Sequence, residues 1–482
     1  MNQTEFIFKT KPWEHQLKAL SYLYERNAAA LYTDMGTGKT KVMIDLVVNR
    51  GFKRVLITCT SKGCDVWERE FKKHSFIDPQ FVYNLSGVST SDKVSAIKSE
   101  PLRSYLSDPA TTVVFICNYE GVWREPFART LLTKKVGIDC VICDESHKIK
   151  SPGSKCSRYL TKIGKRVPHR YLVTGTPMAE NPEDIYAQYK FLDPAIFGTN
   201  LQEFRERYEN PDLKMSAKIG AWIVDKNDPY KNEKELHDKM FSCAFKADSS
   251  VKLPAQRSIV YKFPISKKAE KAYKELEKEG VLEYRAGDLV VENILNMSMR
   301  KQQLLSGFVP VISDEGEKRY VNIDHSKAEA LQELLEGLPP DEPVVVFARY
   351  KKDLKAIQQV CEKLHRGASE LSGGRDTEAD WQAGKTSVLA VQFSSGSESV
   401  DFTRARYCIY YSHTVSLAQY LQSKKRIHRP GQTRPVVYYH LVAQLSKGTS
   451  EDEKYIAAYK RKQEVIDYIM EYESKCKSTP EV

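Results

Sequence analysis

Short apolar runs alternate with helical stretches over the first two hundred residues, and this alternation limits the possible folds more than any other feature. Runs that are apolar throughout, rather than at every second residue, are typical of strands buried on both faces of a parallel sheet. We therefore expect a first α/β lobe over residues 1–198. Its strand candidates are Ala28–Tyr32, Val55–Thr58, Val113–Cys117, Cys140–Cys143 and Tyr171–Val173.

Strand-like runs return in the second half of the chain and predict a second α/β lobe over residues 321–445. These runs are Val344–Phe347, Ser387–Val391, Tyr407–Tyr411 and Val436–Leu441. Between the lobes, charged stretches with helix-like spacing predict helical protrusions and a linker over residues 199–320. A capping box at Ser450 and Glu453 predicts a C-terminal docking helix within residues 446–482. At 482 residues the chain is long enough for two core-bearing domains.

Composition excludes several classes of protein. A hydrophobic share of 41% and a charged share of 28% argue against a disordered or fibrous chain. No apolar run approaches the ~20 residues that span a bilayer, and the first residues lack the apolar core of a secretory signal, so we expect a cytoplasmic protein. Cys140 and Cys143 form a C-x-x-C within an apolar run, and we interpret them as buried strand residues. The net charge of +11 is compatible with a polyanionic partner but does not establish one.

The segment DMGTGKT follows the first apolar run and precedes a helical stretch, which is the setting of a phosphate-binding loop. Glycines let backbone N–H groups close around phosphates, and a helix N-terminus adds positive potential. We expect Lys39 to reach the β- and γ-phosphates and the Thr40 hydroxyl to bind Mg²⁺. The rest of the loop is Gly36, Thr37 and Gly38. Thr33 stands where the strict motif has glycine, and a Gly-rich turn before a helix is the alternative.

Asp144 and Glu145 come at the end of the apolar run IDCVIC. This is the expected place for one carboxylate that holds Mg²⁺ and a second that activates the attacking water. Two solvated acids at a strand end are the alternative, but the preceding phosphate loop favours the catalytic interpretation. Together the two motifs predict an enzyme that hydrolyses a nucleoside triphosphate.

Arg426 and Arg429 are three residues apart in a basic stretch near the end of the second lobe. On a helix they would share a face, and both could reach a γ-phosphate as arginine fingers do. A basic surface helix is the alternative, and for Lys424 and Lys425 we favour it.

The ordered series of motifs resembles the superfamily-two helicases, and more narrowly the Swi/Snf-type DNA translocases, particularly compact bacterial and phage members. The similarity runs from about Lys11 to Lys462. It implies two RecA-like lobes and the cytoplasm of a prokaryotic or phage-infected cell. The motifs are HQ at His15-Gln16, MGTGKT, NYE at Asn118-Tyr119-Glu120, DESH at Asp144–His147, TGTP at Thr174–Pro177, and RIHRPGQ at Arg426–Gln432.

The resemblance implies a role for each matching residue. Gln16 would read the adenine edge, and Gln422 would complete the ATP pocket together with Arg426 and Arg429. A pocket of this kind exists only when the lobes close, which would couple hydrolysis to stepping. The residues that would couple ATP state to lobe movement are Thr174, Gly175, Thr176, Gly396 and Asp401.

Candidate nucleic-acid contacts follow the predicted strands of both lobes. The carboxyl ends of strands are where open α/β sheets bind ligands. Solvated charge on a loop is an equal alternative for each position. The candidates are Ser61, Lys62, Asn118, Tyr119, Arg349 and Lys351.

The sequence departs from the pattern of these translocases at three places. Ser146 replaces a small residue of the acidic motif, which leaves both carboxylates in place. Ser399 stands where a second glycine is usual, which puts the loop that links DNA to ATP in doubt. Ala244 and Phe245 replace a basic pair in the insertion.

We expect a monomeric, DNA-stimulated ATPase that moves along double-stranded DNA and that a protein partner directs. Its work would be remodelling, reannealing or junction processing. The alternatives are a strand-separating DNA or RNA helicase and an ATP-gated DNA clamp.

Overall fold

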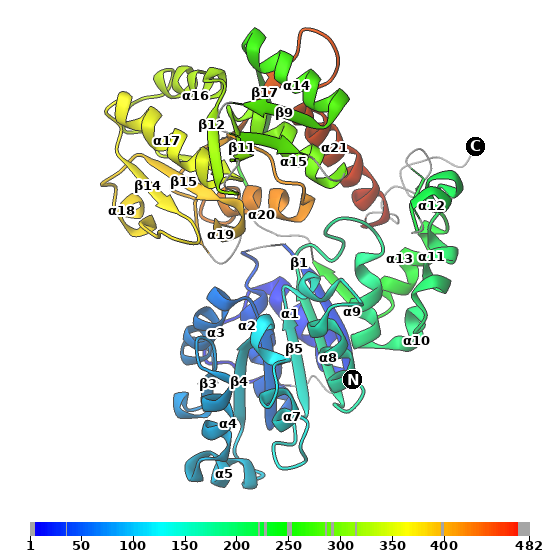
Figure 1. Cartoon of the computed structure of the whole chain (residues 1–482). Coiled ribbons are helices and arrows are strands. Elements are labelled where there is room, and N and C mark those ends of the chain that lie inside the picture. Colours follow the sequence, from blue (N-terminus) through cyan, green and yellow to red (C-terminus); the bar gives the residue numbers. More distant parts are fainter. Residues whose placement is uncertain are drawn as a thin grey trace, which may run out of the picture. The chain divides into compact units, whose positions relative to one another are not determined.

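The computed structural model describes residues 5–34, 36–219, 222–225, 229–247, 253–284, 287–290, 294–313, 316–396 and 400–470. The chain divides into two compact units (Figure 1). Unit 1 comprises residues 1–251 and 464–482, and unit 2 comprises residues 252–463. No helix of the described part is long and apolar enough to span a lipid bilayer.

Unit 1 is built on a seven-stranded sheet in the order β3-β4-β2-β5-β6-β1-β7. Every neighbouring pair in it is parallel, so the carboxyl ends of the strands share one edge. The five predicted strands are confirmed as β1, β2, β4, β5 and β6, within two residues at each end. The bounds are β1 Ala28–Thr33, β2 Arg54–Cys59, β3 Val82–Asn84, β4 Val113–Asn118, β5 Cys140–Asp144, β6 His169–Thr174 and β7 Ala244–Ala247.

Helices cover both faces of this sheet. The core on one face joins alternate strand residues to the apolar sides of α1, α2 and α3. Cys140 and Cys143 are both fully buried in β5, as the apolar run predicts. The helices are α1 Glu14–Tyr24, α2 Lys39–Arg50, α3 Ser61–His74, α4 Thr90–Lys98, α5 Glu100–Ser107, α6 Tyr119–Val122, α7 Phe127–Leu131, α8 Lys155–Gly164 and α9 Asp184–Leu192, with the 3-10 turns η1 Pro79–Phe81 and η2 Ser146–Ile149.

The described part of the segment between α9 and residue 241 is largely helical, in agreement with the charged, helix-spaced sequence. It contains α10 Pro194–Phe197, α11 Leu201–Tyr208, α12 Leu213–Ile219 and α13 Glu233–Phe241. The chain then enters the first sheet again, because β7 pairs with β1 and sets Ala244 opposite Ala30 and Phe245 opposite Leu31. The two residues that replace a basic pair are therefore part of the sheet.

Unit 2 contains a six-stranded parallel sheet in the order β14-β15-β13-β16-β17-β8. The four predicted strands are confirmed as β13, β15, β16 and β17. The bounds are β8 Gln256–Pro264, β13 Val344–Ala348, β14 Ala368–Leu371, β15 Val388–Gln392, β16 Tyr407–Tyr410 and β17 Val436–Gln444. The helices are α14 Lys267–Glu279, α15 Ile294–Leu305, α16 Ser326–Glu336, α17 Lys351–Lys363, α18 Glu378–Gln382, α19 Phe393–Gly396, α20 Leu417–Ile427 and α21 Glu451–Met470.

Two features of unit 2 lie within the span predicted for helical protrusions and linker, residues 199–320, but consist of strands. β8 belongs to the six-stranded sheet, although it precedes residue 321. A separate antiparallel sheet in the order β12-β11-β10-β9 follows α14. Its strands are β9 Val281–Tyr284, β10 Gly287–Val290, β11 Phe308–Ile312 and β12 Lys318–Asn322.

The C-terminal helix α21 begins as its capping box predicts. The Ser450 hydroxyl accepts a hydrogen bond from the Glu453 backbone at 3.3 Å, and the Glu453 carboxylate accepts one from the Ser450 backbone at 3.0 Å. Tyr455, Tyr459 and Ile469 on the predicted apolar stripe are buried. The prediction of a packed helix after residue 446 is confirmed up to Met470.

Candidate ATP and nucleic-acid site

The phosphate loop of unit 1 lies between β1 and α2, as the sequence predicts. Gly36 and Gly38 both have positive φ, at 80° and 77°, which side chains other than glycine rarely adopt. Lys39 is the first residue of α2, and its ammonium donates to the carbonyls of Thr33 and Asp34 at 3.0 and 2.9 Å. The backbone thus has the turn and the helix N-terminus that a phosphate cradle requires.

Gln16 is buried against this loop. Its side-chain amide donates to the Thr37 carbonyl at 3.0 Å, and its oxygen accepts from the Trp13 backbone at 2.9 Å. A Cβ on Gly38 would lie 2.2 Å from the Gln16 amide nitrogen. Gln16 therefore supports the loop directly, and a side chain at position 38 would have to displace the end of the Gln16 side chain.

Asp144 ends β5 and is held from two sides. The Trp67 indole donates to one carboxylate oxygen at 2.8 Å, and the Glu145 backbone donates to the other at 3.0 Å. Burial and the charge of Glu145 raise the pKa of the Asp144 carboxyl to about 6, while the Trp67 hydrogen bond and the charge of Lys39 lower it. The loop after β1 and the carboxylates after β5 lie at the same edge of the parallel sheet, with β6 as the one strand between β1 and β5.

Glu145 has a left-handed backbone with φ 52°, which is uncommon for a residue with a side chain. Its carboxylate accepts a hydrogen bond from the Thr174 hydroxyl at 3.3 Å and lies 3.4 Å from His147 Nδ1. Burial lowers the pKa of His147 to about 4, so this imidazole is neutral near pH 7. The Thr174 hydroxyl also accepts from the Thr176 backbone at 3.1 Å, which joins the TGTP motif to the acidic motif.

Two residues near the carboxylates were missed by sequence reasoning. Trp67 lies on α3, 77 residues before its partner Asp144, and no motif marks it. The sequence marks His147 only as the last residue of the DESH motif. Ser146, the unusual residue in that motif, is fully buried, and its hydroxyl donates to the Gln188 side chain at 2.7 Å. That hydrogen bond explains why serine fits there.

The candidate nucleic-acid contacts of unit 1 divide into two kinds. Ser61 and Lys62 are exposed at the start of α3, and the Asn118 amide donates to the Ser61 hydroxyl at 3.3 Å. Tyr119 is instead 4% exposed, and its hydroxyl donates to the Asp144 carbonyl at 2.6 Å. The prediction that the Tyr119 side chain contacts nucleic acid is therefore corrected. Its ring is buried inside the lobe, next to Asp144.

In unit 2, Gln422 and Arg426 lie on α20 and are both largely buried. The expectation that Arg429 shares their helix is wrong, because α20 ends at Ile427. Pro430 disfavours a helical backbone at the residue before it, so the helix stops short of Arg429. Arg429 instead extends toward Asp401, with 3.7 Å between its guanidinium and the carboxylate.

Hydrogen bonds hold the C-terminal end of the loop that carries Asp401. Asp401 accepts a hydrogen bond from the Thr403 backbone at 2.8 Å, and the Phe402 backbone donates to the Arg426 carbonyl at 2.9 Å. The structure therefore brings Asp401 and the arginine-bearing segment together. Gly396 is the last residue of α19, and Ser399 lies outside the described residues.

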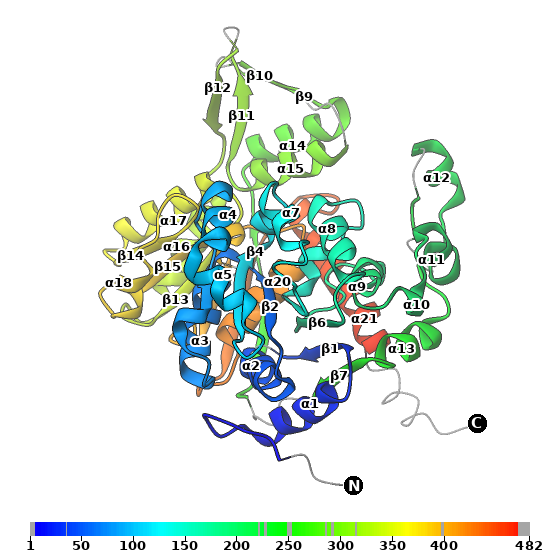
Figure 2. The same cartoon turned by 90° about the horizontal axis from the view of Figure 1, so that it is seen from below.

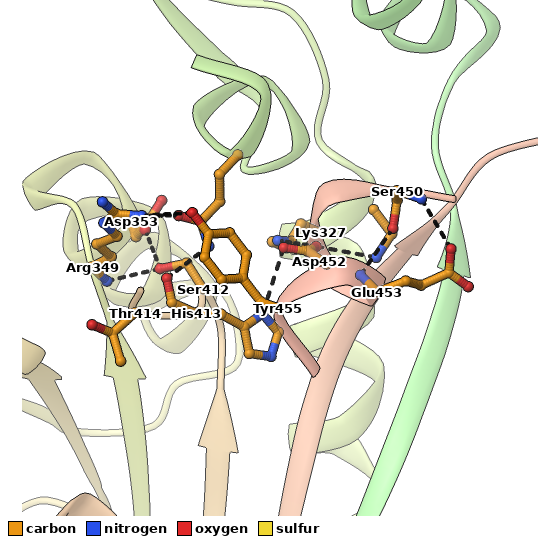
Figure 3. A network of polar contacts seen from close by, with 12 residues as sticks. Lys327, Arg349, Asp353, Ser412, His413, Thr414, Ser450, Asp452, Glu453 and Tyr455 are labelled. Atoms are coloured by element: carbon orange, nitrogen blue, oxygen red, sulfur yellow. Dashed lines mark hydrogen bonds and ion pairs between the residues drawn. The ribbon is translucent and has the colours of Figure 1, made fainter. Parts of the chain in front are cut away.

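Arg349 follows β13 and is held in a polar network (Figure 3). Its backbone donates to the Ser412 hydroxyl at 2.7 Å, and Ser412 donates to the buried Asp353 at 2.6 Å. Its guanidinium donates to the Gln302 side chain at 2.7 Å and to the Tyr455 hydroxyl at 3.3 Å. Arg349 is thus partly buried and fixed in position, whereas Lys351 is exposed.

The network also anchors the start of α21. Lys327 and Asp452 form an ion pair of 2.9 Å in which neither side chain is more than 1% exposed (Figure 3). Burial opposes the charged form of Asp452, but Lys327 and His413 hold its pKa at about 2. Because such a pair is costly to break once buried, it fixes the first turn of α21, which carries Tyr455 toward Arg349.

Two family profiles match long stretches of this chain. The profile of the SNF2-related domain matches residues 15–306, and that of the helicase conserved C-terminal domain matches residues 326–431. A solved structure described as the Sulfolobus solfataricus SWI2/SNF2 ATPase core in complex with dsDNA is 18% identical, covers 98% of this chain and 95% of its own, and has a TM-score of 0.41.

The similar curated proteins are longer than this chain. The DNA repair and recombination protein RDH54 of Saccharomyces cerevisiae is 23% identical, over 86% of this chain and 47% of its own length. The DNA repair and recombination protein RAD54B of Gallus gallus is 24% identical, over 92% of this chain and 52% of its own length. The CHD3-type chromatin-remodeling factor PICKLE of Arabidopsis thaliana is 24% identical, over 91% of this chain and 33% of its own length. The chain spans about half the length of the first two and a third of the last. Since the SNF2-related profile covers more than half of its residues, the chain belongs to the SNF2-related family.

Proposed function

We propose that this protein is a DNA-stimulated ATPase that translocates on double-stranded DNA. The observation that carries the ATPase is the grouping of the phosphate loop with Asp144 and Glu145 at one edge of the first sheet. The names of similar proteins in DNA repair, recombination and chromatin remodelling support DNA as the track. Remodelling of bound proteins, reannealing and junction processing are the tasks that such a motor would serve.

The chemistry follows from the residues of unit 1. Lys39 and the backbone of the loop would bind the phosphates, and Gln16 would bind the adenine. Glu145 would accept a proton from the attacking water, and Thr174 holds that carboxylate in place. Asp144 and Thr40 fit a magnesium ion, because a carboxylate and a hydroxyl are oxygen ligands of the kind that Mg²⁺ prefers. When bound, Mg²⁺ would neutralise charge on the phosphates.

Residues of unit 2 complete the proposed machinery. Arg426 and Arg429 would stabilise the γ-phosphate in the transition state, with Gln422 beside them. Asp401, Gly396 and the TGTP residues Thr174, Gly175 and Thr176 would couple nucleotide state to movement. The proposed nucleic-acid contacts are Ser61, Lys62, Asn118, Arg349 and Lys351.

A strand-separating helicase is the second candidate, and residues 400–422 argue against it. Unwinding relatives in this superfamily often carry a wedge hairpin in this region. Here the segment holds one strand, β16, and the start of α20, with no β-hairpin. We therefore expect ATP-driven displacement of a third strand from a triplex without opening of a forked duplex. Efficient fork opening would overturn this choice, and hydrolysis without any triplex displacement would favour the ATP-gated clamp.

Gly38→Ala is expected to weaken ATP binding by about tenfold, because the new Cβ would push the Gln16 amide out of its place against the loop. Gly51→Ala is the matched control. Gly51 ends the same helix with φ 64°, and its Cβ would meet no atom within 4 Å. Both variants carry similar backbone strain, so ATP titration by fluorescence should separate them. Equal losses of affinity would show that strain, rather than the collision, is responsible.

Trp67→Phe is expected to raise the Mg²⁺ concentration for half-maximal ATPase by about tenfold, the scale of a hydrogen bond to a charged group. The indole N–H lowers the pKa of Asp144, so its loss favours the protonated carboxyl, which cannot bind a cation. In the wild type the Mg²⁺ requirement should rise as pH falls through about 6. The variant should show this rise at higher pH. If the pH dependence of the Mg²⁺ requirement is the same in Trp67→Phe as in the wild type, Trp67 does not act on Asp144.

A further inference from the structure

The strands β11 and β12 of unit 2 form an antiparallel hairpin (Figure 2), one face of which combines apolar, aromatic and basic side chains. Tyr320 lies opposite Pro310 and Lys318 opposite Ile312 in the antiparallel register, so these side chains share one face. The other face carries Val309 and Val311, which are fully buried in the core of unit 2. On the outer face, Ile312 is 61% exposed and Tyr320 is 44% exposed.

Two lysine side chains gather around the Tyr320 ring. The Lys318 ammonium lies 5.7 Å from the ring centroid and the Lys352 ammonium lies 4.9 Å from it. Lys352 comes from the first turn of α17, next to Lys351. The hairpin face is therefore continuous with the nucleic-acid contact proposed after β13.

The charge of this surface is not balanced locally. Within the described residues, no carboxylate lies within ion-pair distance of Lys318, Lys351 or Lys352. Lys351 and Lys352 also occupy the first turn of α17, whose N-terminus is capped by the buried Asp353 carboxylate. The two ammonium groups are therefore the charges on this side of the surface that could bind a phosphate.

Lysine on an edge strand can also prevent strands of other molecules from pairing there. That role would explain Lys318, because β12 is an edge strand. It would not explain Lys352, which lies on a helix and turns toward the same ring. A surface that binds an anion accounts for both.

We propose that Lys318, Tyr320 and Lys352 form a second contact with the phosphate backbone of duplex DNA, continuous with Lys351. This inference rests on the proposed function. The lysines would each bind a phosphate, and the Tyr320 ring would hold the two ammonium groups at a fixed spacing along the strand.

The test is equilibrium binding of the full chain to a short duplex at several salt concentrations. Lys318→Ala and Lys352→Ala should each lower the slope of log affinity against log salt by about 0.9, the value for one phosphate contact. Arg319→Ala is the matched control, since it removes the same charge from the same strand. Its side chain points to the other face and pairs with Glu317 at 3.0 Å. Its slope should equal that of the wild type.

The outcomes are distinguishable. Equal slopes for all three variants would overturn the inference, because net charge alone would then explain any loss of affinity. If the wild type neither binds duplex DNA nor shows DNA-stimulated ATPase, the proposed function fails and this contact fails with it. Lys318→Gln and Lys352→Gln keep most of the stem, and they should reproduce the alanine slopes if folding is intact.

Discussion

Lys39→Ala and Glu145→Gln will both abolish ATP hydrolysis, but only Lys39→Ala will also abolish tight ATP binding. Lys39 supplies the positive charge of the phosphate loop, and a lost charged hydrogen bond costs about 1.5–3 kcal/mol, or roughly ten- to hundredfold in affinity. Its ammonium donates to the carbonyls of Thr33 and Asp34, so it is directed at the loop.

Glu145 follows β5 and is not part of the phosphate loop. Its carboxylate lies beside Thr174 and His147, and glutamine keeps an oxygen that can accept from the Thr174 hydroxyl. Loss of a general base reduces turnover by about 10²- to 10⁴-fold. We therefore expect Glu145→Gln to bind ATP as the wild type does.

The measurement is ATP affinity by titration together with single-turnover hydrolysis, with and without duplex DNA. Glu100→Gln is a suitable control because its carboxylate lies in the exposed first turn of α5 and, among the residues that the structure describes, pairs only with Arg103. If Glu145→Gln lost ATP binding as fully as Lys39→Ala, the role proposed for this carboxylate would be wrong.

The sheets could be predicted where their strands are buried on both faces. Val344–Phe347 is an unbroken apolar run, and β13 is indeed buried throughout. β8 has no such run, because it is an edge strand and Phe263 is its one buried residue. A strand of this kind is specified by the open edge of β17 rather than by its own sequence.

The candidate site could be predicted only in part. Motifs identify Lys39, Asp144 and Glu145, because phosphate and magnesium chemistry requires fixed residue types at fixed places. Trp67 could not be found in this way, since its indole reaches Asp144 from another helix and tryptophan is ordinarily core material. The contact of Tyr119 with Asp144 was also hidden, because the sequence does not say on which side of the strand end the ring turns.

Arg426→Ala is expected to reduce DNA-stimulated turnover by about 10³-fold, the scale of a lost arginine finger. The fold should survive, because the contact of Arg426 with Phe402 is made by its backbone carbonyl, which alanine retains. Lys425→Ala is the matched control on the same helix. It removes one positive charge next to Arg426, and it should leave turnover near the wild-type value.

Arg429 requires a different comparison, because its guanidinium lies near Asp401. If Arg429 acts on the γ-phosphate, Arg429→Ala should lower turnover far more than Asp401→Asn, which removes the same ion pair from the other side. If the ion pair is all that matters, the two variants should be equally impaired. Single-turnover hydrolysis at saturating ATP and DNA measures both. If Arg426→Ala and Arg429→Ala instead lost DNA affinity but kept normal turnover, the two arginines would be part of a basic DNA-binding surface and not arginine fingers.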